Sequence, residues 1–317
     1  MESLPDGVIS HLREVVTGPD FTGTRYELIE EIGRGGMGAV YAGLDTQLDR
    51  RVALKVLNFS DPDGRAAARM ADEARILARL EHPGMVPVHD LGRLPDGRVY
   101  YAMKLVDGTR LDRYAHDRPP LTERLRVFLR ICETVAFAHS QGVIHRDLKP
   151  QNIMVGGFGE VLVLDWGVAK IAGVAREFLS ASAAERGDTA PGTAIGTPGY
   201  MAPEQMSGAP GEIDARSDIY SLGKTLEALV ENREGQIPRR LRAIYEKAAS
   251  IDRGLRYTTA VELAADVERF QNGEQVLAYR ETLAERLGRL LARNRVLVLL
   301  VGAYLAMRIV LIFFTRH

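Results

Sequence analysis

The sequence predicts an α+β fold in two unequal parts, a small one rich in strands and a larger one that is mainly helical. Short apolar alternations at residues 26–33, 39–45 and 50–58 are bounded by Gly, Asp and Asn, a pattern typical of antiparallel strands. After Thr122 the apolar residues take helical spacing instead. A length of 317 residues allows two parts that each bury a core.

A helix and two further strands complete the small part. Residues 64–80 have helical composition, and 82–94 and 98–106 are predicted as strands joined by a Pro-Asp-Gly turn. The larger part is predicted to begin with a helix at 122–140, with Thr122 as its N-cap. The remaining helices are expected at 216–231, 238–249 and 259–271, after short apolar runs at 152–156 and 160–167.

The overall composition is that of an ordinary globular protein. With 41 Lys and Arg, 42 Asp and Glu, and 46% hydrophobic residues, it excludes a wholly disordered, collagen-like or multi-span membrane protein. The net charge of −1 gives no reason to expect a nucleic-acid partner. Cys132, the single cysteine, lies in an apolar-periodic stretch and is predicted to be a buried core residue, with a reactive thiol as the alternative.

A glycine-rich segment at residues 32–40 lies between the first two strands. Gly33, Gly35 and Gly38 would let backbone N–H groups approach a polyphosphate without a clash at Cβ. A glycine-rich hairpin without a ligand is the alternative. A dinucleotide-binding fold would need a helix directly after the third glycine, whereas Val40 continues a strand, so that fold is excluded.

A lysine lies within the third apolar strand, at Lys55. Such a lysine either extends from a sheet edge into solvent or meets an anion. Glu73, on the helix that follows, could pair with Lys55 and hold it toward phosphates. The alternative for Glu73 is a solvated carboxylate on the helix face.

Four further polar residues lie close together in sequence. Asp147, Lys149 and Asn152 fall between a helix and a strand, where loops carry function, and Asp165 ends an apolar strand. Asn152 and Asp165 offer oxygen ligands that suit Mg²⁺, which takes one or two protein ligands plus phosphate oxygens and water. Asp147 is then left to accept a proton from an attacking hydroxyl.

The motifs stand in the order of the protein-kinase signature: Gly-x-Gly-x-x-Gly-x-Val, Val-Ala-Leu-Lys, His-Arg-Asp-Leu-Lys-Pro-x-Asn, Asp-x-Gly and Ala-Pro-Glu. Over residues 26–271 the chain resembles the eukaryotic-like (Hanks-type) serine/threonine kinases of bacteria. The resemblance implies a bilobal protein-kinase fold, with a β-rich N-lobe at about 26–105 and a helical C-lobe at about 106–271. Residues 1–25 would be an N-terminal extension.

The resemblance assigns a role to each polar residue. Asp147 would be the catalytic base, Lys149 would neutralise the γ-phosphate, and Asn152 and Asp165 would bind Mg²⁺, with Mn²⁺ as an alternative metal. The ATP contacts would come from Ile32, Gly33, Arg34, Gly35, Gly36, Met37, Gly38, Ala39, Val40, Lys55 and Glu73. Lys149 and the Gly-Thr-Pro-Gly-Tyr-Met-Ala-Pro-Glu segment at 196–204 favour the serine/threonine type over the tyrosine type.

Structural roles follow from the same resemblance. Glu204 would pair with Arg256, and Asp218 would brace the catalytic loop. Trp166 departs from the family's usual Phe, and its N–H needs a partner. The packed column of the family is matched by Leu77, Val88, His145 and Trp166.

The segment 165–204 has the composition of a mobile activation loop. Arg146 resembles the arginine that receives an activation-loop phosphate in this family. We therefore expect autophosphorylation on one or more of the first four loop hydroxyls, with a homodimer as the arrangement that permits it. The loop hydroxyls are Ser180, Ser182, Thr189, Thr193 and Thr197.

The end of the chain differs in charge from the rest. Six arginines and no acidic residue follow Glu285, so the near-zero net charge combines an acidic kinase part with a basic tail. Residues 296–314 are an apolar stretch with one charge, Arg308, and at about 28 Å they match a hydrocarbon core of about 30 Å. We expect a single-pass transmembrane helix there. An amphipathic helix docked on the kinase or lying at a lipid surface is the alternative.

The basic residues before that stretch predict its orientation. Arginines recur on one helical face within a juxtamembrane segment at 272–295, which favours contact with anionic lipid on the cytoplasmic side. The expected protein is thus a membrane-tethered, cytoplasmic serine/threonine kinase that uses ATP and Mg²⁺ on protein substrates. The alternatives are a membrane-anchored pseudokinase and a small-molecule kinase on the same fold.

Overall fold

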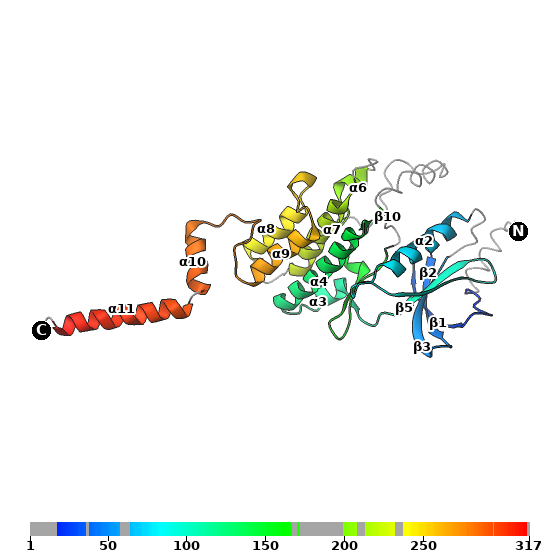
Figure 1. The fold of residues 1–317 in the computed structure, drawn as a ribbon, viewed down its shortest axis with the longest axis horizontal. Coiled ribbons are helices and arrows are strands. Elements are labelled where there is room, and N and C mark those ends of the chain that lie inside the picture. The colour runs from blue at the N-terminus through cyan, green and yellow to red at the C-terminus, as the bar shows by residue number, and fades with distance from the viewer. Residues whose placement is uncertain are drawn as a thin grey trace, which may run out of the picture.

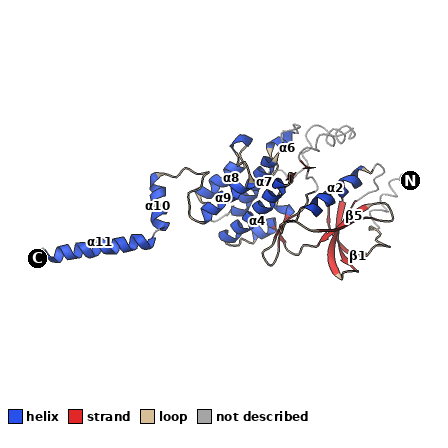
Figure 2. Cartoon of the chain, viewed as in Figure 1, coloured by secondary structure: helices blue, strands red, loops and turns tan. Residues whose placement is uncertain are grey.

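The structure is a computed structural model, and it describes residues 18–35, 38–57, 64–166, 170–171, 199–207, 213–231, 237–293 and 295–315. Figure 1 shows a sheet with one covering helix, a helical body beside it, and two C-terminal helices on the far side of that body. Figure 2 separates the two parts by element type, with the long strands gathered in the N-lobe. The predicted α+β arrangement in two lobes is confirmed.

Five antiparallel strands form the N-lobe sheet in the order β1-β2-β3-β5-β4. Side chains alternate between the two faces of each strand. On β3, Val52, Leu54 and Val56 are buried in an apolar cluster on one face, while Lys55 takes the other face. The strands are β1 (Tyr26–Arg34), β2 (Gly38–Asp45), β3 (Arg50–Leu57), β4 (Val88–Arg93) and β5 (Val99–Lys104).

Helix α2 (Arg65–Arg79) confirms the helix predicted at 64–80. Its buried Met70 and Ala74 pack with Leu57 and Val99 in an apolar cluster between the helix and the sheet. The helix therefore covers the sheet face that carries Lys55.

Helix α4 (Leu121–Ser140) forms the centre of the C-lobe, with residues buried at helical spacing along its length. The predicted N-cap at Thr122 is wrong. The cap is Pro120, whose carbonyl accepts the backbone N–H groups of residues 123 and 124, so Thr122 lies inside the first turn. Cys132 is fully buried on this helix, and burial raises the pKa of its thiol, which supports the core interpretation.

The other long helices of the C-lobe match their predicted ranges within one residue at each end: α7 (Ala215–Val230), α8 (Arg239–Ala248) and α9 (Ala260–Gln271). The predicted apolar runs form a hairpin of β8 (Ile153–Val155) and β9 (Val161–Val163), preceded by a 3-10 turn at Pro150–Asn152. The elements that the pattern did not predict have six residues or fewer, too few to show a period: β6 (Thr109–Arg110), α3 (Leu111–His116), β7 (Val143–Ile144), β10 (Lys170–Ile171) and α6 (Pro203–Ser207).

The chain after α9 first folds back onto the C-lobe. Val276 is fully buried, and the fully buried carboxylate of Asp266 accepts the backbone N–H groups of Leu277 and Ala278 at 2.8 and 2.9 Å. Two helices follow, α10 (Leu283–Arg293), which contains the arginines predicted to lie on one helical face, and α11 (Arg295–Thr315).

The segment predicted to span a membrane, 296–314, lies within α11 and is helical. Over the residues that the structure describes, no helix has the combination of length and apolar character required to cross a membrane. The predicted transmembrane helix is therefore not supported.

Candidate active site

Lys55 and Glu73 form an ion pair between the sheet and α2. Lys55 Nζ donates to Glu73 Oε1 at 2.8 Å. The Glu73 side chain is only 9% exposed, which excludes a solvated carboxylate on the helix face. Burial alone would lower the pKa of Lys55, but the electrostatic effect of the neighbouring oxygens of Tyr101, Glu73 and Asp165 raises it above the usual value. The lysine is therefore a charged group held in place by a carboxylate.

Asp165 approaches the same lysine from the C-lobe. Its Oδ1 lies 3.7 Å from Lys55 Nζ, and its side chain is 60% exposed, against 9% for Glu73. The φ of Asp165 is 54°, in the left-handed region that is uncommon for residues other than glycine, and such conformations cluster at functional sites. The lysine thus contacts one enclosed carboxylate and one that is open to a ligand.

Two predicted residues of the catalytic loop, Lys149 and Asn152, converge on the carboxylate of the third, Asp147. Lys149 Nζ lies 2.8 Å from Asp147 Oδ2. Asn152 Nδ2 donates to the backbone carbonyl of Asp147 at 2.8 Å and lies 3.2 Å from its Oδ2. Within the described part of the chain the contacts to the carboxylate itself all involve Oδ2, which leaves Oδ1 of Asp147 able to accept a proton.

Asp218 of α7 fixes the backbone just before that carboxylate. Its two oxygens accept the N–H groups of His145 and Arg146 at 2.8 and 2.9 Å, and His139 Nε2 lies 2.8 Å from Oδ2. Burial would raise the pKa of Asp218, but the hydrogen bond from His139 and the backbone donors lower it overall, so the carboxylate is ionised. Arg146 is held at a φ of 69°, and its carbonyl accepts from Gln205 Nε2 at 2.7 Å. The predicted brace is confirmed.

The glycine-rich segment lies between β1 and β2, and β2 pairs with the strand that carries Lys55. Val40 is the direct cross-strand partner of Lys55 and lies on the same sheet face, whereas Ala39 is buried in the cluster on the opposite face. A Cβ on Gly38 would lie 2.5 Å from the carbonyl oxygen of Val56, so close strand packing requires glycine there. Around Gly33 a Cβ would meet nothing within 4 Å.

The structure describes only some of the other residues predicted to contact ATP. Ile32 is 49% exposed and Arg34 pairs with Glu31 on the surface. The Gly35 N–H donates to the Gly38 carbonyl at 2.9 Å, which closes the segment at its base. Gly36 and Met37 lie outside the described residues, as do Ser180, Ser182, Thr189, Thr193 and Thr197 of the predicted activation loop.

The predicted metal ligands offer a donor set that fits Mg²⁺. Asn152 is 6% exposed, and both of its amide hydrogen bonds use Nδ2, so its carbonyl oxygen is not consumed by them. Asp165 supplies the open carboxylate. In the described ranges no three His, Cys, Asp or Glu side chains gather into a metal cage. Two oxygen ligands without a cage suit a cation that completes its shell with phosphate oxygens and water.

The predicted column packs between the two lobes. The rings of His145 and Trp166 lie 4.6 Å apart, and Leu77 is buried in the same cluster, with Val88 partly buried against it. Trp166 Nε1 donates to the Val163 carbonyl at 3.0 Å, which supplies the partner that the sequence required. A tryptophan therefore replaces the usual Phe without an unsatisfied donor.

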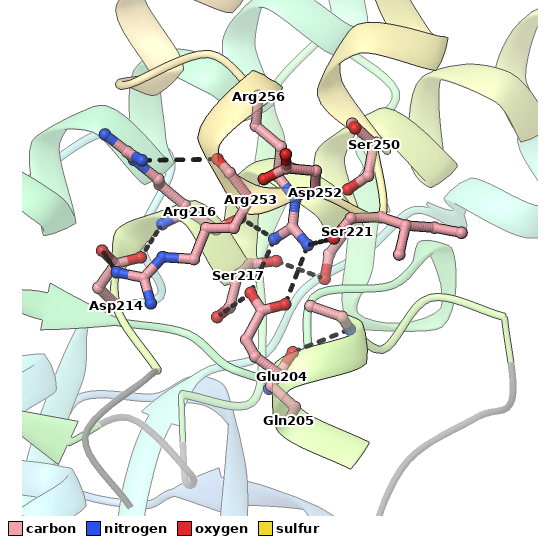
Figure 3. A network of polar contacts seen from close by, with 12 residues as sticks. Glu204, Gln205, Asp214, Arg216, Ser217, Ser221, Ser250, Asp252, Arg253 and Arg256 are labelled. Carbon is pink, nitrogen blue, oxygen red and sulfur yellow. Dashed lines mark hydrogen bonds and ion pairs between the residues drawn. The ribbon is translucent and has the colours of Figure 1, made fainter. Parts of the chain in front are cut away.

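Glu204 and Arg256 form the predicted buried pair. Arg256 Nη1 and Nη2 donate to Glu204 Oε1 and Oε2 at 2.7 and 2.9 Å, a bidentate geometry that is visible in Figure 3. Ser217 Oγ donates to the same carboxylate at 2.8 Å. The pair ties α6, at the end of the predicted activation loop, to the loop before α9.

Sequence reasoning did not identify three residues that support this site: Tyr101, His139 and Gln205. Each acts through a partner that is distant in sequence: Tyr101 contacts Glu73, His139 contacts Asp218, and Gln205 contacts the Arg146 carbonyl. The period-two alternation of residues 98–106 already places Tyr101 on the face of β5 that carries Val99 and Met103. The register that sets it beside Lys55 is a tertiary feature.

Comparisons with known proteins place the chain in one family. The family described as "Protein kinase domain" matches residues 26–273. "Serine/threonine-protein kinase PknD" of Protochlamydia amoebophila (strain UWE25) is 33% identical over 81% of this chain and 31% of its own length. The protein of that name from Chlamydia muridarum is 35% identical over 83% of this chain and 33% of its own. The crystal structure of the Mycobacterium tuberculosis PknI kinase domain superposes with a TM-score of 0.57 at 25% identity, over 80% of this chain and 98% of that one.

Proposed function

Because the chain belongs to the protein kinase family, we propose that it is a serine/threonine protein kinase that transfers the γ-phosphate of ATP to protein hydroxyls. Two groups of side-chain contacts carry the proposal. In the first, Lys55 contacts Glu73 and Asp165. In the second, Lys149 and Asn152 contact Asp147. The chain spans about a third of the length of the curated relatives it matches.

The roles of the residues follow from charge and geometry. Lys55 and Lys149 neutralise the phosphate oxygens, and most of the rate gain comes from such positioning and electrostatic stabilisation. Asp147 orients the substrate hydroxyl and takes its proton while the new O–P bond forms and the bond from the γ-phosphorus to ADP breaks. Asn152 and Asp165 would hold Mg²⁺, or Mn²⁺ in its place, which neutralises phosphate charge when bound.

Two other functions are compatible with the fold. A pseudokinase that serves as a binding module would be expected to have lost one of Lys55, Asp147, Asn152 and Asp165, and all four are present. A small-molecule kinase is disfavoured by the segment 196–204, which resembles the substrate segment of serine/threonine protein kinases.

Incubating the full chain with radiolabelled ATP, Mg²⁺ and a mixture of unrelated proteins tests the proposal. We expect label on phosphoserine and phosphothreonine, loss of transfer when EDTA removes the metal, and recovery when Mg²⁺ or Mn²⁺ is added back. Nucleotide binding without any transfer would favour the pseudokinase, and label on a small molecule but on no protein would favour the third function.

We also propose autophosphorylation between two copies of the chain, on one or more of Ser180, Ser182, Thr189 and Thr193. The proposal is supported by Arg146 next to the base and by the hydroxyl-rich composition of the loop. Mapping phosphate on the chain from the same reaction decides it. An unmodified loop in fully active protein would refute it.

For the basic tail we propose contact with anionic lipid, which would place the kinase domain at the cytoplasmic face of a membrane. Helix α10 supports this because Arg286, Arg289 and Arg293 recur at i, i+3 and i+7, while Leu283 and Leu287 are 85% and 59% exposed. Each basic residue near an anionic surface contributes about 1 kcal/mol.

Sedimentation of the full chain with lipid vesicles measures this contact. We expect binding to phosphatidylcholine vesicles that contain phosphatidylserine, weakened about a hundredfold by replacing Arg286, Arg289 and Arg293 with alanine and weakened further by salt. The control removes the same charge elsewhere, at the exposed Arg79, Arg126 and Arg130. Equal weakening in the control variant, or equal binding to neutral vesicles, would contradict a lipid site on α10.

A further inference from the structure

Tyr101 on β5 contacts the Lys55–Glu73 pair and was given no role by the motifs. In the pairing of β3 with β5, Tyr101 is the direct cross-strand partner of Lys55, so both side chains leave the sheet on the face that α2 covers. The ammonium of Lys55 lies 5.6 Å from the centre of the Tyr101 ring. Two neighbouring strands therefore direct one polar side chain each toward the same helix.

Both side chains end on the same atom of α2. Tyr101 donates its hydroxyl hydrogen to Glu73 Oε1 at 2.8 Å, and Lys55 Nζ donates to that oxygen at 2.8 Å as well. Tyr101 is 2% exposed, and burial raises the pKa of its phenol above the usual value, so the hydroxyl keeps the proton that it donates. The hydrogen bond is charge-assisted and shielded from water, the setting in which such bonds are strongest.

We propose that Tyr101 is a positioning residue that holds α2 against the sheet, with Glu73 directed at Lys55, through the hydrogen bond from its hydroxyl group to Glu73. The name hydroxyl lock is used below for the Tyr101–Glu73 hydrogen bond. An apolar residue at position 101 would still pack against Met70 and Ala74 of α2, but it would leave Lys55 as the only one of these two donors to Glu73 Oε1.

The hydroxyl lock matters most when an anion binds. Lys55 faces both Glu73 and the open carboxylate of Asp165, so a phosphate that enters beside Asp165 competes with Glu73 for the ammonium. Tyr101 carries no charge that a phosphate would attract, and its hydrogen bond stays on Glu73. The tyrosine therefore keeps the helix and its carboxylate in place while the lysine turns its charge toward the nucleotide.

Replacing Tyr101 with phenylalanine removes only the hydroxyl and tests the lock. We expect hydrogen–deuterium exchange at the amides of α2 to accelerate about tenfold, and nucleotide affinity and kcat/KM for ATP to fall about tenfold, which corresponds to one charge-assisted hydrogen bond. The matched control is Tyr100→Phe, one residue away on the opposite face, where the ring packs with Phe21 and Tyr26 in the other cluster. That variant should leave all three quantities unchanged.

A second comparison separates positioning from a general packing role. In a Glu73→Ala background the lock has no acceptor, so adding Tyr101→Phe should cause no further change in exchange or nucleotide affinity. Equal effects of Tyr101→Phe with and without Glu73 would overturn the proposal, as would unchanged exchange and affinity in the single variant. The kinetic measurement rests on the proposed kinase function, whereas exchange and nucleotide binding do not, so failure of one is distinguishable from failure of the other.

Discussion

Replacing Asp147 with asparagine is expected to lower kcat for phosphate transfer by about 10²- to 10⁴-fold, the usual contribution of a positioned general base. The amide keeps the size of the carboxylate and can still contact Lys149 and Asn152, so the loop geometry should survive. It cannot accept the proton of the substrate hydroxyl. Nucleotide affinity should therefore change by less than about threefold, because the loss is confined to the transition state.

Single-turnover transfer rates and a separate nucleotide-binding titration measure the two effects. Asp117→Asn, an exposed replacement at the end of α3, is the control for the same chemical change and should behave as the unaltered protein. A transfer rate within threefold of the unaltered protein in Asp147→Asn would remove Asp147 from the base role. A parallel collapse of nucleotide affinity would instead indicate that the loop had lost its shape.

The residues of the candidate site could be predicted because their spacing along the chain is itself the signal. Lys55, Asp147, Asn152 and Asp165 stand in ordered motifs, and the expected pairing of Lys55 with Glu73 agrees with the observed 2.8 Å contact. The long helices could also be predicted, because ten or more residues reveal a 3.6-residue period. The missed N-cap at Thr122 reflects the lower reliability of helix ends than of helix existence.

The supporting residues could not be predicted from local pattern. His139 and Asp218 are 79 residues apart and meet only because α4 packs against α7. Tyr101 and Glu73 are 28 residues apart and depend on the strand register. The segment at 296–314 shows the opposite problem: apolar composition predicted a membrane span, and the described helices do not support one.

Replacing Arg256 with alanine is expected to lower the free energy of unfolding by about 3–5 kcal/mol, because it leaves the Glu204 carboxylate buried without its bidentate partner. Arg256 is fully buried, and its Nη1 also donates to the Arg216 carbonyl at 3.0 Å, so several acceptors lose a donor together. The matched control is Arg253→Ala in the same region of Figure 3, whose pair with Asp214 is 35% and 43% exposed. That change should cost about 1 kcal/mol or less.

The dependence of the free energy of unfolding on pH below 7 distinguishes loss of the Glu204–Arg256 ion pair from loss of side-chain packing. Burial alone would raise the pKa of Glu204, but hydrogen bonds from Arg256 and Ser217 lower it below its usual value in the folded protein. A carboxylate whose folded pKa is depressed contributes stability above its unfolded pKa, and this contribution is lost as pH falls through the folded value. Urea unfolding from pH 7 to pH 3 should therefore show the difference in free energy of unfolding between the unaltered protein and Arg256→Ala narrowing as pH falls, because the buried carboxylate without Arg256 takes up a proton at a higher pH than the paired one. A difference in free energy of unfolding that stays constant down to pH 3 would instead show that Arg256→Ala destabilises the protein by removing the packing of the Arg256 side chain against Tyr220.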